Sequence, residues 1–306
     1  MFLNRLKFFL FPFNGIHGYV HVHNEYKYVN IRQIVNSYSL EKQKYLPREI
    51  MQYFFNHFEF LLCKHCNLNC KSCTAMSPLY RLSPEIYDIE QFKSDVLDLK
   101  RIIPKDRNIY FGLVGGEPFL LKELEQYVIF LRKNFKNSFI SITTNGTKIL
   151  GKDVSFLRKN RCFVFISPYP CVDTKKVLTF LKKEKVQCNT TVKAGEFNTR
   201  VIPLDPRGCQ NKDIAFSTCF FKCNEIFNGY FCPCFYPFVI KKCNEYFNES
   251  FKTEVQDTLE LSTVKDYYEL CNFSKHSIPF CKYCVNEIKE YSLWEKSKLE
   301  RSEWLF

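Results

Sequence analysis

Cys66-Asn67-Leu68-Asn69-Cys70-Lys71-Ser72-Cys73 places three thiols in one short stretch, with three and then two residues between them. It follows the apolar run at residues 58–62, whose length and aromatic and aliphatic content predict a β-strand. The cysteines are therefore predicted in the loop at the C-terminal end of that strand. Open α/β sheets and α/β barrels hold their ligands at such loops.

Three close thiols suit a metal better than a disulfide, which uses only two. Structural zinc takes four ligands in a tetrahedron, and an iron–sulfur cubane also takes four thiolates as a rule. Three ligands on a cubane would leave one iron open to a small molecule, as catalytic zinc keeps an open position. A zinc site remains the alternative for this stretch.

The spacing Cys66-x3-Cys70-x2-Cys73 resembles the cluster motif of radical S-adenosylmethionine (radical SAM) enzymes. The resemblance implies a [4Fe–4S] cluster whose open iron is chelated by the amino and carboxylate groups of S-adenosylmethionine (SAM). It further implies reductive cleavage of SAM to methionine and a 5′-deoxyadenosyl radical that abstracts hydrogen from a substrate. Many family members carry an aromatic residue before the third cysteine, where this chain has Ser72, so the adenine contact is expected from elsewhere.

Composition describes an ordinary globular chain of 306 residues, long enough for one large core or two domains, with 46% hydrophobic and 25% charged residues. The net charge of +12 is not gathered into a basic stripe with interleaved aromatics, so no nucleic-acid partner is predicted. A basic rim would instead attract an anionic substrate or an acidic electron donor. By resemblance, that donor is a flavodoxin or a ferredoxin.

Sixteen cysteines without a secretory signal favour a reducing compartment, where cysteines serve as metal ligands or catalytic groups. The apolar run at residues 8–13 is interrupted by Pro12, lacks a small-residue cleavage site and is too short to span a bilayer. A cytoplasmic protein without a membrane span is therefore predicted. Residues 1–56 form an N-terminal segment of unknown role. Its histidines His17, His21 and His23 have no cysteine or acid at the spacing of metal ligands, so no metal site is predicted there. Residues 46–55 are predicted to form a short helix.

From residue 57 to 205, strand and helix patterns alternate as in repeated βα units. Five to six such units fall short of a closed eight-stranded barrel, so the predicted fold is α/β, a partial (β/α)6 TIM-like barrel. It is also the radical SAM core by resemblance. The predicted strands after the first are 109–114, 139–143, 162–166 and 186–192, and the predicted helices are 89–99, 121–131 and 174–185.

Polar and glycine residues follow the predicted strands. Gly115-Gly116-Glu117 matches the family's Gly-Gly-Glu motif; glycines permit close backbone approach, and by resemblance the backbone and Glu117 receive the ammonium of SAM. Asn145 and Ser167 end the next two strands and are candidate SAM contacts, since both types can hydrogen-bond ribose hydroxyls. The family's glycine-rich adenine motif is not evident on the fifth strand.

Nine of the sixteen cysteines lie from Cys209 onward, in a predicted small cysteine-rich domain at residues 206–306 that ends in a helix. Cys219, Gly229 and Cys234, followed by Cys281 and Cys284, resemble the Twitch version of the SPASM domain. The resemblance implies a second [4Fe–4S] cluster on those four cysteines, and Gly229 permits the hairpin that brings Cys219 and Cys234 together. Cys223 and Cys232 compete for these positions, and zinc is the alternative metal.

The leading hypothesis is a radical SAM enzyme that takes hydrogen from a carbohydrate-like or other small polar substrate, in an oxidation or an epimerisation. An epimerase needs a hydrogen donor, for which Cys171 or Cys209 is available, and a dehydrogenase needs an electron exit. Peptide modification is the alternative within the same chemistry. A zinc-stabilised binding module without catalysis is the alternative from another class.

Overall fold

The computed structural model describes residues 17–22, 25–30, 57–105, 107, 109–191, 199–219, 221, 223–285, 287, 289–291 and 294–306. The chain divides into two compact units, Met1–Phe55 and Asn56–Phe306. In the first, strands β1 (His17–Val22) and β2 (Glu25–Asn30) pair antiparallel. The helix predicted at 46–55, and His23, lie outside the described residues.

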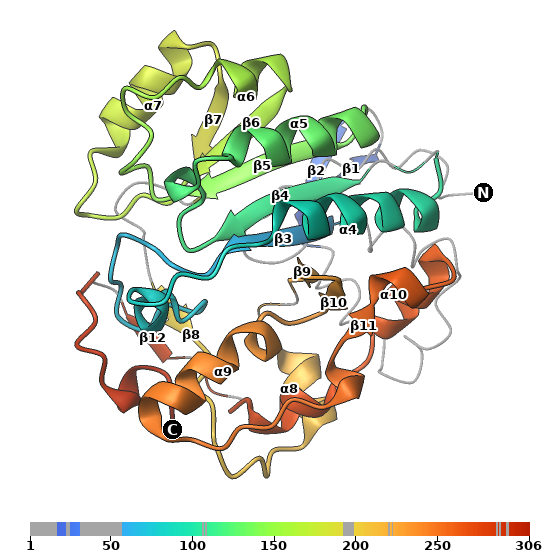
Figure 1. Ribbon diagram of the computed structural model, residues 1–306, viewed down its shortest axis with the longest axis vertical. Coiled ribbons are helices and arrows are strands. Elements are labelled where there is room, and N and C mark those ends of the chain that lie inside the picture. Colours follow the sequence, from blue (N-terminus) through green and yellow to red (C-terminus); the bar gives the residue numbers. More distant parts are fainter. Residues whose placement is uncertain are drawn as a thin grey trace. The chain divides into compact units, whose positions relative to one another are not determined.

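The second unit is built on an eight-stranded sheet in the order β11-β10-β9-β3-β4-β5-β6-β7. Its strands β3 to β7 are all parallel, which confirms the predicted series of βα units. The sheet begins at β11 and ends at β7 without closing, as expected of a partial barrel (Figure 1). The parallel strands are β3 (His57–Cys63), β4 (Tyr110–Gly115), β5 (Phe139–Thr144), β6 (Cys162–Ile166) and β7 (Gln187–Thr190).

Helices connect these strands and cover one face of the sheet, as Figure 1 shows for α4 and α5. Asp88 precedes helix α4 as its N-cap, and its carboxylate accepts from the amides of Glu90 and Gln91, which satisfies two free donors. Three of these helices were predicted, whereas α6 was not. The four are α4 (Ile89–Ile102), α5 (Leu124–Asn134), α6 (Ser155–Lys159) and α7 (Thr174–Lys183).

The first four residues of β3 alternate between a buried face and a half-buried one. Phe58 and Phe60 are 0% exposed, and the Phe60 ring lies 4.7 Å from that of Phe92 on α4. Burial of each aromatic side chain stabilises the fold by about 1.5–3 kcal/mol, so the contacts on this face hold the helices against the sheet. Glu59 lies between the two phenylalanines and so points to the opposite face, away from α4.

The C-terminal part of the chain continues the same sheet. The turn Asn228-Gly229, with φ of 46° and 89°, joins β9 (Glu225–Phe227) to β10 (Tyr230–Cys232) as a two-residue hairpin. Strand β9 then pairs parallel with β3. The predicted hairpin at Gly229 is thus present, and it extends the sheet of the βα units rather than standing apart.

The remaining elements that the structure describes in the second unit are mostly short. They are α8 (Lys212–Thr218), α9 (Tyr236–Phe247), α10 (Tyr267–Phe273), β11 (Leu259–Glu260), the pair β8 (Thr199–Val201) and β12 (Lys289–Tyr291), and six 3₁₀ turns: Ser77–Tyr80, Pro118–Leu120, Val255–Asp257, Leu261–Thr263, Pro279–Tyr283 and Arg301–Glu303. The helix expected at the C-terminal end is not formed in the described residues, where Arg301–Glu303 is a single 3₁₀ turn. Within the described chain, no helix is long and apolar enough to cross a membrane.

Candidate metal and cofactor site

The three-cysteine stretch begins three residues after the end of β3, at the C-terminal edge of the parallel strands. Cys70 is 6% exposed, while Cys66 and Cys73 are half-buried. Burial, with a smaller contribution from the neighbouring Cys73, raises the pKa of the Cys70 thiol to about 12. Burial likewise raises the pKa of Cys66, and Cys73 and Cys70 add to that shift. The three sulfurs therefore lie close enough to influence one another's pKa values.

A single tetrahedral zinc would hold sulfur atoms about 3.8 Å apart, since each lies about 2.3 Å from the ion. In the described part of the chain, the three sulfurs are not a group whose atoms all lie within 4.8 Å of one another. A cubane places each thiolate on a different iron, so it suits more widely spaced sulfurs. The donor set and its spacing fit an iron–sulfur cluster better than one ion.

Two aromatic side chains also reach this set. The indole Nε1–H of Trp294 donates to Cys70 Sγ at 3.1 Å. Tyr169, which follows β6, also hydrogen-bonds Cys70, and burial together with all three sulfurs raises the pKa of its phenol. Sequence reasoning missed both residues, because each is near the cysteines only in the folded chain.

Gly115 and Gly116 bring the end of β4 against the start of the cysteine loop. A Cβ on Gly116 would lie 1.9 Å from the carbonyl oxygen of His65, and Gly115 has a φ of +143°. The amide of Gly116 donates to Cys63 O at 2.7 Å, and that of Glu117 donates to His65 O at 3.1 Å. Only glycine permits this approach, as the sequence predicted.

The Glu117 carboxylate is 0% exposed and joins two strand ends. Its Oε1 accepts from the amide of Phe119 at 3.0 Å and from Thr144 Oγ1 at 2.7 Å, and its Oε2 accepts from the amide of Asn145 at 2.8 Å. Burial raises its pKa, and the three hydrogen bonds oppose that shift. A carboxylate has about four acceptor positions, so Oε2 keeps one for a further donor.

Asn145 lies at the site, but its amide is already engaged. Its Nδ2 donates to Asn67 Oδ1 at 3.1 Å and lies 3.4 Å from Cys66 Sγ, while its Oδ1 accepts from the amide of Thr147 at 2.9 Å. The side chain thus ties the end of β5 to the cysteine loop. Ser167 is half-buried after β6, and its amide donates to Thr144 O at 2.9 Å.

The C-terminal segment 294–304 forms hydrogen bonds with the cysteine loop. Lys71 N donates to Glu295 O at 2.9 Å, and Ser297 N donates to Asn69 O at 2.7 Å. The indole of Trp304, 0% exposed, donates to Cys73 O at 2.7 Å. We call residues 294–304 the clasp. This role was not predicted, because nothing local marks residues that act 224 or more positions away.

The second cysteine set also converges. Cys281 lies in the 3₁₀ turn Pro279–Tyr283 and Cys284 caps it, and residues three apart in such a turn project to the same side. Burial raises the pKa of Cys234, and the sulfurs of Cys232, Cys284, Cys219 and Cys281 contribute to the shift in that order. Cys219 ends α8 and Cys234 follows β10, so four separate backbone positions bring thiols into one buried region.

The two competing cysteines also have partners outside this set. Cys232 Sγ donates to Asp257 O at 3.1 Å. Cys223 Sγ lies within 4.8 Å of carboxylate oxygens of Glu59 and Glu225. Within the described residues, that trio is the one group with single-ion spacing; no three of the four converging cysteines form another.

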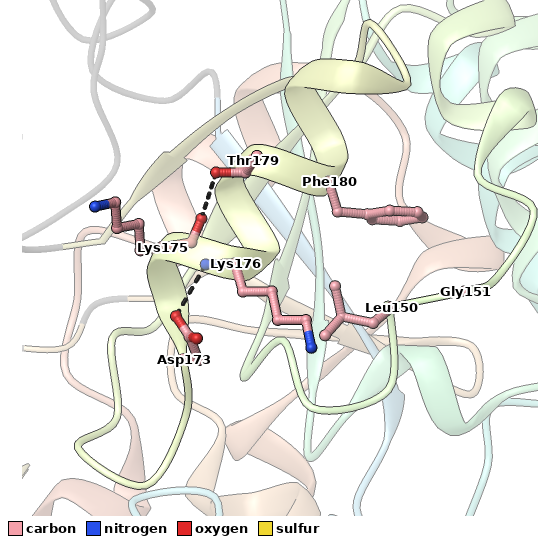
Figure 2. A pocket seen from close by; sticks show the side chains of 7 residues that line it. All are labelled: Leu150, Gly151, Asp173, Lys175, Lys176, Thr179 and Phe180. Atoms are coloured by element: carbon pink, nitrogen blue, oxygen red, sulfur yellow. Dashed lines mark hydrogen bonds between the residues drawn. The ribbon is translucent and has the colours of Figure 1, made fainter.

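A separate hollow of about 630 Å³ lies on the surface beside α7. Figure 2 shows the Phe180 ring and the Leu150 side chain facing it, with Asp173 and two lysines at its edge. None of the predicted site residues lines it. It belongs to neither cysteine set.

No protein-family model matches the chain, and no curated protein does either. Among solved structures, it is similar to native anSMEcpe with bound AdoMet, at 26% identity and a TM-score of 0.36 over 44% of this chain and 43% of that one. The match therefore spans less than half of anSMEcpe.

Two further matches are weaker in identity. The complex of BtrN with AdoMet and 2-DOIA is 16% identical, with a TM-score of 0.47, over 79% of this chain and 98% of that one. Streptococcus suis SuiB bound to precursor peptide SuiA is 16% identical, with a TM-score of 0.34, over 44% of this chain and 32% of that one. Because every one of these TM-scores is below 0.5, we infer function from the site residues and not from these likenesses.

The open parallel sheet, the three-thiol loop and the paired glycines occur together at one edge. Fold and site in combination define the class of protein: an α/β chain with an open, mostly parallel sheet and a three-cysteine loop at the C-terminal ends of its strands.

Proposed function

We propose that the chain is a radical SAM enzyme in which Cys66, Cys70 and Cys73 hold a [4Fe–4S] cluster with one iron left open for SAM. The observation that carries the proposal is the packing of Gly116 onto the cysteine loop, which fixes three converging thiols beside the strand ends. When bound, the cluster supplies the electron that cleaves SAM to methionine and a 5′-deoxyadenosyl radical.

The chain's own residues position the reactants and exclude water. Glu117 holds the ends of β4 and β5 together and keeps one acceptor position on Oε2, the atom we assign to the ammonium of SAM. Asn145 orients the loop at Cys66, and a contact of this side chain with a ribose would require an exchange of its present partners. Ser167 remains our candidate ribose contact after β6.

For the adenine contact missing at Ser72, the aromatic candidate is Tyr169, because it lies against all three sulfurs. For the auxiliary cluster we propose the ligands Cys219, Cys234, Cys281 and Cys284. Their convergence supports this set, but the Cys232 sulfur also contributes to the pKa shift of Cys234, so Cys232 stays a competing ligand, whereas the Cys223 sulfur lies against Glu59 and Glu225. Four protein ligands would leave that cluster without an open iron, suited to electron transfer.

The reaction we propose is hydrogen abstraction from a carbohydrate-like or other small polar substrate, followed by oxidation or epimerisation. Of the two candidate hydrogen donors for epimerisation, Cys171 is exposed and close enough to Cys70 to affect its pKa. Cys209 instead lies 3.7 Å from Asp205 Oδ2. The placement favours Cys171, and a flavodoxin or ferredoxin is the proposed electron source.

The experiment is anaerobic reconstitution followed by incubation with SAM and dithionite, with 5′-deoxyadenosine measured by chromatography. Wild type is expected to form it, and Cys66→Ala is expected to lose at least about a hundredfold. Cys188→Ala is the matched control, since this half-buried thiol lies on β7 outside both cysteine sets. Full SAM cleavage by Cys66→Ala would refute Cys66 as a cluster ligand. A colourless protein that holds only zinc would refute the proposed enzyme function.

A further inference from the structure

A third group of metal-binding side chains lies apart from both cysteine sets. Glu59 on β3 and Glu225 on β9 are direct partners in the parallel register, so their side chains point to the same face of the sheet. Cys223, two residues before Glu225, reaches the same place, and one ligand atom from each residue lies within 4.8 Å of the others. We call these three residues the β3–β9 triad.

The neighbouring strand leaves room for this triad. Gly112 on β4 lies beside Glu59 in the register, and a Cβ there would come within 3.2 Å of Glu59 Cγ and 3.4 Å of Glu59 Oε1. A larger residue would therefore press on the carboxylate. Strands β3, β4 and β9 together form a recess suited to the Glu59 side chain.

Glu225 is 3% exposed, and its Oε2 is buried without a hydrogen-bond partner. Its carboxyl faces that of Glu59, and two ionised carboxylates offer only acceptors to each other. Burial, and then the adjacent Glu59, raise the pKa of Glu225 well above its usual value. A buried pair of this kind requires either a shared proton or a cation between its oxygens.

The third member identifies the cation. A thiol beside two carboxylates disfavours Mg²⁺ and Ca²⁺, which prefer oxygen, and suits Zn²⁺, which binds sulfur and oxygen at about 2.0–2.3 Å. Atoms within 4.8 Å of one another need only small movements to reach one such ion. His57 Nε2 lies 3.3 Å from Glu59 Oε1, where an imidazole can orient a ligating carboxylate from outside.

We propose that Glu59, Cys223 and Glu225 bind one zinc ion, which fastens the β9–β10 hairpin to β3. The Cys223 thiol, now 3.6 Å from Phe221 O, would give up its proton to solvent on binding, as would any proton shared by the carboxyls. The ion would steady the hairpin whose far end leads to Cys234. This site is independent of the radical SAM proposal and shares no ligand with it.

The test uses the full chain, purified without oxygen with its clusters in place, equilibrated with Zn²⁺ and passed over a weak chelating resin. Zinc and iron are counted in the same sample, and zinc X-ray absorption reports the ligand atoms. We expect about one zinc per chain, with one sulfur and otherwise nitrogen or oxygen scatterers. Failure to retain zinc, or a shell made only of sulfur as in the cysteine sets, would overturn the proposal.

Variants locate the ion. Cys223→Ser and Glu225→Gln are expected to lower retained zinc at least tenfold while leaving cluster iron unchanged. Cys188→Ser and Glu260→Gln are the matched controls, one half-buried and one exposed, on β7 and β11. Unchanged zinc in both triad variants would refute the site. If either variant fails to fold, the wild-type absorption spectrum still decides, because it needs no mutant.

Discussion

The indole of Trp294 forms a hydrogen bond to Cys70, a proposed ligand of the SAM-binding cluster. Its indole N–H lies 3.1 Å from Cys70 Sγ, and donors to cluster thiolates stabilise the more negative, reduced state. Tyr169 approaches the same sulfur from the end of β6. In the proposed enzyme, these two side chains, which are not ligands, would help to set the reduction potential of the cluster.

Trp294→Phe should therefore lower the midpoint potential of the SAM-binding cluster. One hydrogen bond is worth about 1 kcal/mol, and 59 mV corresponds to a tenfold change for one electron, so the shift should be about 40 mV. A redox titration followed by electron paramagnetic resonance measures it. Tyr268→Phe, at an exposed position on α10, serves as the control, and an unshifted Trp294→Phe potential would remove the proposed role.

At the scale of elements, the site depends on three segments that meet: the cysteine loop, the end of β4 and the clasp. Gly116 gives the sharpest test, because a Cβ there would lie 1.9 Å from His65 O. Gly116→Ala must displace the loop, so we expect destabilisation of about 3 kcal/mol, the upper range for overpacking. About four of eight cluster irons should also be lost.

Gly151→Ala is the matched control for this change. Gly151 has a φ of +77° with nothing within 4 Å of a new Cβ, so it should cost only about 1 kcal/mol and no iron. Denaturant melts and iron counts on both variants measure the difference. Equal effects at the two positions would show that the close approach at Gly116 is unimportant.

The clasp gives a second test at this scale. Trp304→Phe removes one of the two donors to Cys73 O, the other being the amide of Met76, and should destabilise the protein by about 1 kcal/mol, the typical net value of one hydrogen bond. Hydrogen exchange should quicken in residues 66–76 more than in β6. Uniform exchange changes across both regions would argue against a local clasp.

Much of the arrangement of strands, helices and the cysteine loop could be predicted from the sequence. Strand runs and terminal polar residues predicted the parallel series and the position of the cysteine loop, since these depend on local pattern. The clasp, Tyr169 and the β3–β9 triad could not be predicted, because each joins residues far apart in the chain. The expected C-terminal helix was wrong in the described residues, where tertiary hydrogen bonds to the cysteine loop hold the segment in irregular form.

At the scale of the whole molecule, one sheet links the two cysteine sets. Strands β9, β10 and β11 extend the βα sheet, so Cys234, which follows β10, is attached to the framework that holds the first set. The three-part division at residues 56 and 205 stays a prediction, and Asn56–Phe306 is compact as one unit.

Removing both Cys281 and Cys284 by alanine substitution should lower iron from about eight to about four per chain. SAM cleavage with dithionite should persist, because the first cluster keeps all its ligands. Cys188→Ala is again the control. About four irons per chain in the wild type would refute the second cluster. Loss of SAM cleavage together with iron in the double variant would show that the two sites do not hold clusters separately.

The proposed chemistry requires that three thiolates leave one iron open and that SAM occupies it. Electron–nuclear double resonance on the reduced cluster, with SAM carrying ¹⁷O in its carboxylate or ¹⁵N in its amino group, detects that contact itself. We expect hyperfine coupling from both labels to the cluster spin, retained when Cys281 and Cys284 are replaced. An intact, reduced cluster that shows no coupling from either label at saturating SAM would contradict the proposal.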